Sequence, residues 1–298
     1  MEYDLICVLG PTASGKTRFA VRLAYEAGGE IISADSRQIY RGMDIGTGKD
    51  LSDYLYQGVQ IPYHLIDIAE PGTKYNIFEY QRDFHRAYEE IRGRGKLPVL
   101  CGGSGLYIEA ATRGYSMPEV PPNPELRAQL ESKSTIELIT MLASMKKLHN
   151  KTDTDSRKRL IRALEIAFFE NNHNSKRAQV KESLYPPVNT RYIGISVSRE
   201  ERIARIDKRL KERLKEGMVE EVEALLKRGI AAEDLIYYGL EYKFVTLYII
   251  GKLSYEQMEN QLATAIHQFA KRQMTWFRGM ERRGIKIEWM SPGSTLTL

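Results

Sequence analysis

The residues with the clearest chemical use lie near the amino terminus, where a glycine-rich stretch ends in a lysine and a threonine. Its members are Gly10, Pro11, Thr12, Ala13, Ser14, Gly15, Lys16 and Thr17. In this spacing, backbone N–H groups surround two linked phosphates, the lysine adds a positive charge and the threonine hydroxyl ligates magnesium. We therefore predict a phosphate-binding loop with Thr17 as a metal ligand. The loop alone leaves open which molecule carries the phosphates.

A loop of this kind needs a buried strand before it and a helix after it, because the amino end of the helix supplies unpaired N–H donors to the anion. Residues 5–9 are a short apolar run typical of a buried parallel strand. Residues 18–24 carry apolar side chains at helical spacing. Both flanking elements are thus predicted.

Two other predicted strands end in residues suited to a ligand site. Residues 30–35 form an apolar run that ends in Asp35, and residues 97–101 lead into the cluster Gly102, Gly103, Ser104 and Gly105. The carboxyl ends of parallel strands meet at one edge of a sheet, so Asp35 should face the phosphate loop. It would act as a base or lie behind the magnesium ligands. The glycine cluster is a second place where backbone can approach a ligand.

The remaining elements complete an α/β fold. We expect a surface loop at 36–49, a third strand at 64–68, a helix at 77–92, a strand at 191–197, and helices at 199–228 and 262–280. Proline clusters near 118–124 and at 186–187 bound a segment with helical patterning. We predict a parallel sheet flanked by helices, of the P-loop NTPase type, formed by residues 1–115 and 189–298, with residues 116–188 as an inserted helical subdomain.

Cations gather in three of the predicted helices, where a solvated cationic surface is the alternative to a binding role. The insert contains Arg157, Lys158, Arg159 and Arg162, and its Leu160, Leu164 and Phe168 should face inward. The helix at 199–228 contains Arg202, Arg205, Lys208, Arg209 and Arg213, any of which could reach the phosphates. In the last helix Phe269, Trp276 and Met280 should form the core face, opposite Lys271, Arg278 and Arg282. Cations spread over separate regions suit a chain of phosphates.

Composition is that of a globular protein, with 42% hydrophobic and 28% charged residues among 298. There is no apolar run long enough to cross a bilayer, and we expect a cytoplasmic monomer that does not contact membranes. Cys7 and Cys101 lie in separate apolar runs, which favours buried reduced thiols over a disulfide. A net charge of +5 fits an anionic partner.

Two phosphate-handling classes must be weighed against a nucleic-acid enzyme. The tetrapeptide at 150–153 matches the guanine-reading N-K-x-D pattern of GTPases, but it follows a predicted helix rather than a buried strand. A small-molecule kinase with Asp35 as its base is the stronger alternative. The cations of the insert and of the last helix exceed what a metabolite requires.

Five sequence blocks together resemble the bacterial tRNA dimethylallyltransferases. They are the phosphate loop, residues 33–47 (SADSRQIYRGMDIGT), residues 102–107 (GGSGLY), residues 159–165 (RLIRALE) and residues 271–278 (KRQMTWFR). The blocks occur in the order of that family and span almost the full chain. Several of them are much more specific than a phosphate loop alone.

The resemblance implies that the loop holds the diphosphate of dimethylallyl diphosphate with Mg²⁺, and that the prenyl group passes to N6 of the adenosine on the 3′ side of the tRNA anticodon. It implies Asp35 as the general base, with Lys16 and Thr17 at the leaving group and Arg209 as a further diphosphate contact. Asp35, Ser36, Arg37, Gln38 and Ser104 would surround a flipped adenine. The anticodon arm would contact Lys158, Arg159, Arg162, Lys271, Arg272, Gln273, Trp276 and Arg278. Prenylation of a free adenine nucleotide, which relatives of the family perform, is the alternative.

The chain departs from the family pattern at Gly239-Leu240-Glu241-Tyr242, where bacterial members usually read glycine, tyrosine, a basic residue, and glutamate or glutamine. An aromatic residue and a cation near the RNA are thus replaced. None of the departures touches Lys16, Thr17 or Asp35.

Overall fold

The computed structural model describes residues 2–115, 120–145, 156–177 and 184–296, and the chain divides into two compact units. The larger unit combines Met1–Tyr115 with Tyr185–Leu298, and the smaller is Ser116–Leu184. The second boundary thus falls slightly before the expected residue 188. The N-K-x-D tetrapeptide at 150–153 lies outside the described residues.

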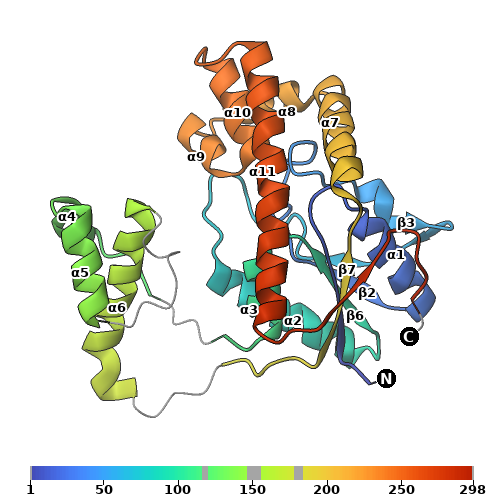
Figure 1. Ribbon diagram of the computed structural model, residues 1–298, viewed down its shortest axis with the longest axis horizontal. Coiled ribbons are helices and arrows are strands. Elements are labelled where there is room, and N and C mark those ends of the chain that lie inside the picture. The colour runs from blue at the N-terminus through green and yellow to red at the C-terminus, as the bar shows by residue number, and fades with distance from the viewer. Residues whose placement is uncertain (1, 116–119, 146–155, 178–183, 297–298) are drawn as a thin grey trace. The chain divides into compact units, whose positions relative to one another are not determined.

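A parallel sheet forms the centre of the larger unit (Figure 1). Its strands are β1 (Leu5–Leu9), β2 (Glu30–Ser33), β5 (Tyr63–His64), β6 (Pro98–Gly102), β7 (Thr190–Ile195) and β8 (Ile287–Met290). They follow the order β5-β2-β6-β1-β7-β8, and every pairing is parallel. The carboxyl ends of β1, β2 and β6 therefore meet at one edge. The predicted α/β fold is confirmed.

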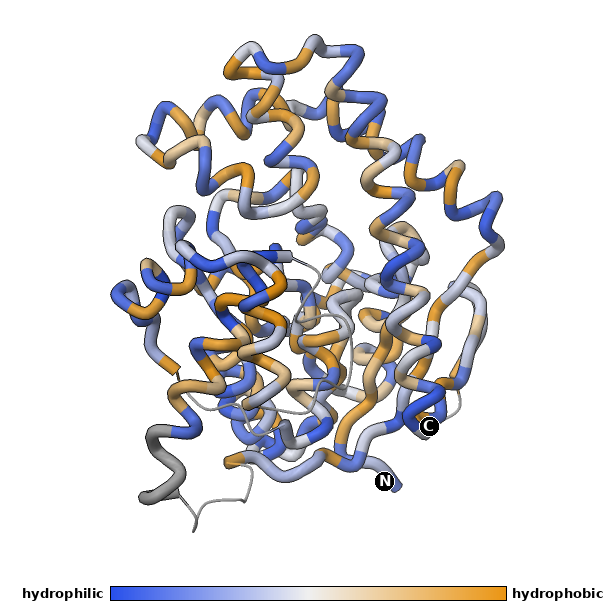
Figure 2. The backbone as a smooth tube through the Cα atoms, turned by 60° about the vertical axis from the view of Figure 1, so that its left-hand side comes forward, coloured by the Kyte–Doolittle hydropathy of each residue, from blue (hydrophilic) through white to orange (hydrophobic). Residues whose placement is uncertain are grey.

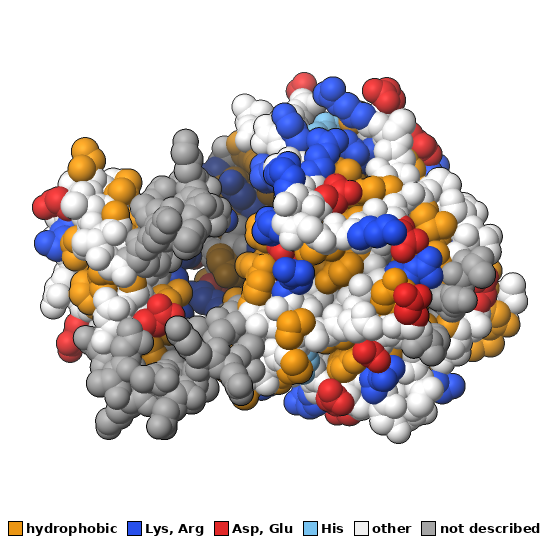
Figure 3. Space-filling model, turned by 60° about the horizontal axis from the view of Figure 1, so that its bottom comes forward, with side chains coloured by type: hydrophobic (Ala, Val, Ile, Leu, Met, Phe, Trp, Pro, Cys, Tyr) orange, Lys and Arg blue, Asp and Glu red, His pale blue; other side chains and the backbone are white. Residues whose placement is uncertain are grey.

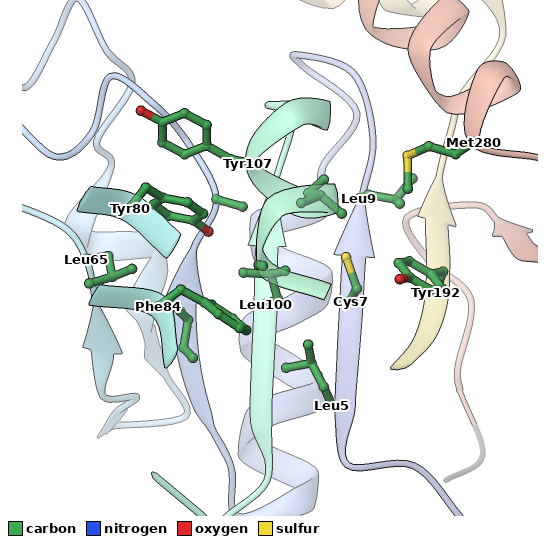
Figure 4. Close-up of a cluster of buried hydrophobic side chains, with 14 of the residues drawn as sticks. Leu5, Cys7, Leu9, Leu65, Tyr80, Phe84, Leu100, Tyr107, Tyr192 and Met280 are labelled. Atoms are coloured by element: carbon green, nitrogen blue, oxygen red, sulfur yellow. The ribbon is translucent and has the colours of Figure 1, made fainter. Parts of the chain in front are cut away.

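Helices cover both faces of this sheet because alternate strand residues are apolar on each side. On one face, α1 (Lys16–Ala27) packs Phe19 and Leu23 against Ile6 and Val8 of β1. The other face carries α2 (Ile77–Gly93) and α3 (Gly105–Thr112). Figure 4 shows this second core, with Cys7 of β1 and Leu100 of β6 on the side of Phe84. A 3₁₀ turn (Leu51–Tyr54) and the hairpin of β3 (Leu55–Tyr56) and β4 (Val59–Gln60) lie apart from the main sheet.

Five further helices form a bundle in the larger unit (Figure 1), and their alternating polar and apolar residues can be followed in Figure 2. They are α7 (Arg199–Lys215), α8 (Met218–Lys227), α9 (Ala232–Tyr237), α10 (Leu240–Ile249) and α11 (Tyr255–Arg282). The prediction of a single helix at 199–228 was wrong, because Gly217 adopts a left-handed φ of 107° and separates α7 from α8. Helix α11 begins earlier than expected, because Ser254 and Gln257 form a capping box. It runs from the bundle to α3 at the sheet.

Two other expectations were wrong. The third strand is only Tyr63–His64, because Leu65 and Asp67 adopt left-handed φ angles of 62° and 55° and end the extended run. On α11, Met280 is buried as expected, but Phe269 and Trp276 are each 38% exposed. In the C-terminal part of α11, the core face is instead formed by Gln273, Phe277 and Met280.

The smaller unit consists of α4 (Pro124–Glu131), α5 (Thr135–Met145) and α6 (Arg157–Arg177). Its core includes the expected Leu160 and Leu164 from α6, with Phe168 packed partly against it. Glu165 is also buried, because it accepts hydrogen bonds from Arg127, from the backbone N–H of Asn123 and from Arg162. Although burial would raise the pKa of Glu165, these donors hold it below its usual range. This carboxylate ties α4 to α6.

The two cysteines are free and buried, as predicted. Burial raises the pKa of both thiols, that of Cys101 to about 11. Because the thiolate is the reactive form, we expect iodoacetamide at pH 8 to alkylate the native protein slowly and the urea-unfolded protein completely. Mass spectrometry of intact protein counts the adducts. Rapid alkylation of either native thiol would contradict the burial described here.

None of the helices in the described ranges is long and apolar enough to span a membrane.

Candidate active site

The glycine-rich loop joins β1 to α1 and leaves an unusual number of donors without protein partners. Ala13 and Gly15 adopt left-handed φ angles of 61° and 86°, which turn the chain around a concave backbone. Within the described part of the chain, no protein acceptor receives the amides of residues 13, 15, 16 and 17. The Ser14 hydroxyl is buried and also lacks a partner. Buried polar groups are normally satisfied, so this loop is built to bind an anion.

Lys16 lies beside this concave backbone and is surrounded by groups from the neighbouring strands. Its ammonium is 3.4 Å from the carbonyl oxygen of Pro11. Burial lowers the pKa of Lys16, and the nearby Cys101 and Asp35 oppose that shift. Because β2, β6 and β1 are neighbouring parallel strands, the residues that follow them, Lys16 and Asp35 among them, lie at the same edge of the sheet.

Arg209 of α7 also reaches the loop, where its guanidinium donates a hydrogen bond to the Thr12 hydroxyl. Burial, and next the charge of Arg213, lower the pKa of Arg209 to about 10. Three other cations of α7 have carboxylate partners: Arg205 pairs with Glu201, Lys208 with Glu212, and Arg213 with Asp50. Arg209 is the cation of α7 whose hydrogen bond joins this helix to the phosphate loop.

Asp35 follows β2 and begins a tight turn at the same edge of the sheet. One of its carboxylate oxygens accepts a hydrogen bond of 3.0 Å from the backbone N–H of Arg37. The next amide, of Ser36, donates to the Ser104 hydroxyl over 3.2 Å. These contacts bring the turn after β2 together with the turn after β6. The other oxygen of Asp35 makes no hydrogen bond within the described residues.

The loop that follows Asp35 is more deeply anchored than a surface loop. Gln38 donates to the carbonyl of Gly48 over 3.1 Å and accepts from the Ser33 hydroxyl. Glu221 of α8 accepts from the backbone N–H groups of residues 44, 45 and 46. The Lys49 side chain is fully buried and donates to Asp44, Asp67 and the carbonyl of Tyr40. Glu221 from α8 and Lys49 from within the loop therefore fix this loop beside Asp35.

Replacing Lys49 with methionine should lower the free energy of unfolding by about 2–4 kcal/mol, because Asp44 and Asp67 lose their shared buried cation while remaining partly exposed themselves. Arg41→Ala, in the same loop, removes an exposed pair with Glu70 and an exposed hydrogen bond to the carbonyl of Asp67, and should cost only about 1 kcal/mol. Urea unfolding of both variants measures the difference. Equal losses would contradict the anchoring role of Lys49.

The second glycine cluster packs closely against α11. A Cβ on Gly103 would lie 2.4 Å from the Gln273 amide nitrogen, and one on Gly105 would lie 2.2 Å from the Trp276 ring. The Trp276 indole N–H also donates to the buried Glu109 over 2.8 Å. These two glycines therefore make room for α11. Ser104 between them accepts the hydrogen bond from the Ser36 amide in the Asp35 turn.

The predicted tRNA-binding residues separate into exposed and enclosed side chains. Lys271, Arg272 and Arg278 are exposed on α11, and Lys158 and Arg159 are exposed on α6. Arg162 is half-buried and bonds Glu165 and the carbonyl of Val120, and Gln273 is only 7% exposed. Figure 3 shows lysine and arginine side chains gathered over one region of the larger unit.

Glu241, which the sequence marked only as part of a departure from the family pattern, lies in the first turn of α10. Burial raises its pKa, and the nearby Arg213 and Arg209 oppose that shift. Its neighbour Tyr242 packs on Gly46 and donates to Glu221 over 2.6 Å. The departure thus places a carboxylate in the first turn of α10, next to Tyr242. The helical spacing of the residues around 241 did not predict that Tyr242, at the start of α10, would contact Gly46 and Glu221.

A divalent cation would find few protein ligands here. The described residues contain no group of three or more histidine, cysteine, aspartate or glutamate side chains able to hold a metal ion. Thr17 lies at the start of α1 next to Lys16, and Asp35 is nearby. Magnesium commonly takes one or two protein oxygens and completes its shell with phosphate and water. These residues fit a cation that is bound together with its phosphates.

Comparison with known proteins gives one family. The IPP transferase family model matches residues 38–280, and the isopentenyl transferase model matches residues 3–63. A tRNA dimethylallyltransferase 1 of Parabacteroides distasonis is 62% identical over 97% of this chain and 92% of that protein. A tRNA dimethylallyltransferase 2 of Bacteroides fragilis is 61% identical over 97% and 93%. The crystal structure of a tRNA isopentenylpyrophosphate transferase from Bacillus halodurans is 31% identical, with a TM-score of 0.69 over 98% of this chain and 90% of that chain. The chain therefore belongs to the IPP transferase family of tRNA-prenylating enzymes.

Proposed function

We propose that this enzyme transfers the dimethylallyl group from dimethylallyl diphosphate to N6 of the adenosine on the 3′ side of the anticodon in tRNAs, and releases diphosphate. The observation that carries the proposal is the set of unpaired donors in the phosphate loop. The amides of residues 13, 15, 16 and 17 and the Ser14 hydroxyl face no protein acceptor in the described chain. Lys16 and Arg209 bond the same loop, at Pro11 and at Thr12.

These donors suit a leaving group. Breaking the bond between the prenyl carbon and oxygen places negative charge on the departing diphosphate. Donors that are already oriented stabilise such charge without reorganising during the reaction. Mg²⁺ bound through Thr17 would neutralise further charge on the diphosphate oxygens. Residues 10–17 and Arg209 together would thus bind the donor and ease its cleavage.

Asp35 is the proposed general base. The N6 amine attacks the prenyl carbon as a neutral nucleophile and then loses a proton, so an acceptor must lie beside it. Only one Asp35 oxygen is engaged by the Arg37 amide, which leaves the other for the amine proton. Ser36, Arg37, Gln38 and Ser104 line the same turn and would surround the adenine after it leaves the anticodon loop stack.

The exposed cations would hold the anticodon arm. We assign phosphate contacts to Lys271, Arg272 and Arg278 on α11 and to Lys158 and Arg159 on α6, because exposed cations bind a phosphate chain without regard to base sequence. Trp276, which is partly exposed between these α11 cations, offers a ring for stacking. Arg162 would act indirectly, by fixing α6 through Glu165.

We expect the enzyme to act as a cytoplasmic monomer.

The proposal is tested by incubating the protein and Mg²⁺ with labelled dimethylallyl diphosphate and either unmodified tRNA or AMP. We expect label in tRNA alone. Label in AMP would indicate prenylation of a free nucleotide. Phosphoryl transfer from ATP to a small hydroxyl compound, without label in either acceptor, would indicate a kinase and overturn the proposal.

A further inference from the structure

Gln273 of α11 is buried and uses both ends of its side-chain amide. Its oxygen accepts a hydrogen bond of 2.8 Å from the backbone N–H of Thr12, in the phosphate loop. Its nitrogen donates over 2.9 Å to the carbonyl of Gly103, in the turn after β6. The side chain is 7% exposed. One glutamine therefore joins the phosphate loop, the turn after β6 and α11.

The connection continues through Thr12 to the other side of the loop. The Thr12 hydroxyl accepts a hydrogen bond from Arg209 of α7, so Gln273 holds the backbone N–H of Thr12 and Arg209 holds its hydroxyl. Thr12 immediately precedes the amides that would bind diphosphate. Its position therefore sets where those amides point.

The residue type at this position is closely specified by its partners. The Thr12 amide requires an acceptor and the Gly103 carbonyl requires a donor, which a primary amide supplies together. A glutamate would keep the first contact but place a second oxygen against the carbonyl. A methionine of similar length would lose both. Glycine at position 103 gives the Gln273 amide its place, because a Cβ there would overlap that amide.

We infer that Gln273 is a positioning residue for the prenyl donor: from helix α11 it holds the phosphate loop in the shape that binds diphosphate. This inference rests on the proposed function of the loop. Gln273 lies on the inward side of α11, which holds the loop. Lys271 and Arg272 lie on the outward side of this helix and are exposed. The diphosphate affinity should thus depend on Gln273, and the affinity for tRNA alone should not.

The test compares Gln273→Glu and Gln273→Met with the same two changes at Gln268, an exposed residue of the same helix. Calorimetric titration of Mg²⁺ and inorganic diphosphate measures the loop directly, and steady-state kinetics give KM for dimethylallyl diphosphate and for tRNA. We expect both Gln273 variants to weaken diphosphate binding and raise the donor KM by about tenfold, the effect of a buried hydrogen-bonding group left unpaired. In the Gln273 variants, the KM for tRNA should stay within about twofold of the wild type. In the Gln268 variants, the diphosphate affinity and both KM values should stay within about twofold of the wild type.

Unchanged diphosphate affinity in the folded Gln273→Met variant would overturn the inference, and so would a loss confined to tRNA affinity. Thermal unfolding identifies any variant that fails to fold. If Gln273→Glu does not fold, Gln273→Met still provides the test. Wild-type protein that bound diphosphate but prenylated no tRNA would instead contradict the proposed function. The two failures are therefore distinguishable.

Discussion

Replacing Asp35 with asparagine should lower kcat for tRNA prenylation by roughly 10²- to 10⁴-fold, the range for losing a general base. Asparagine keeps an oxygen for the Arg37 amide, so the turn that orders residues 35–38 should persist. Because only the proton acceptor is lost, the KM for dimethylallyl diphosphate and the dissociation constant for tRNA should change little. Single-turnover kinetics at saturating tRNA separate the chemical step from binding.

The matched control is Asp53→Asn, which removes a carboxylate that pairs with the exposed Arg18. It should leave kcat within about twofold, as expected for a surface pair. Asp35→Ala adds a second comparison, since it also removes the contact to Arg37. A variant of Asp35 that bound tRNA poorly yet turned over at the wild-type rate at saturation would assign Asp35 to adenine binding instead.

Replacing Lys16 with methionine should reduce kcat/KM for dimethylallyl diphosphate by roughly 10²- to 10³-fold, similar to the loss of one preorganised donor at a developing anion. Methionine preserves the length of the side chain in its enclosed position while removing the charge. The loss should appear in both donor binding and turnover, because the lysine contacts the diphosphate before and during departure. Rapid-quench measurements across donor concentrations resolve the two contributions.

Lys96→Met is the control for a general charge effect. Lys96 is exposed and precedes β6, at the end of the strand opposite the turn that reaches the phosphate loop. It should leave the kinetics unchanged. If Lys16→Met affected only the KM for tRNA, the lysine would contact RNA and the loop would have another ligand.

The sequence predicted those parts of the site that depend on local patterns. The loop from Gly10 to Thr17 has a fixed spacing, and Asp35 ends an apolar run, so their meeting follows from the parallel order of strands. The core face of α6 at Leu160 and Leu164 likewise follows from helical periodicity. Each of these predictions needed only residues close together in the chain.

The parts that the sequence missed depend on contacts between distant segments. Gln273 reaches Thr12 across the fold, and nothing near residue 273 shows that its amide turns inward. Trp276 was placed in the core by periodicity, but Glu109 and Gly105 instead hold it at the edge of the helix packing. Lys49 was read as part of an exposed loop, although Asp67 lies across from it and buries it. Helix and strand periods do not encode such pairings.

The most direct test of the leaving-group account is to count diphosphate against prenyl groups in a reaction without any nucleoside triphosphate. The enzyme, Mg²⁺, dimethylallyl diphosphate and unmodified tRNA should release one diphosphate for each dimethylallyl group found on N6 of the adenosine next to the anticodon. Mass spectrometry of the digested tRNA locates the group, and a coupled assay measures diphosphate. A requirement for ATP, or release of orthophosphate in place of diphosphate, would contradict the account.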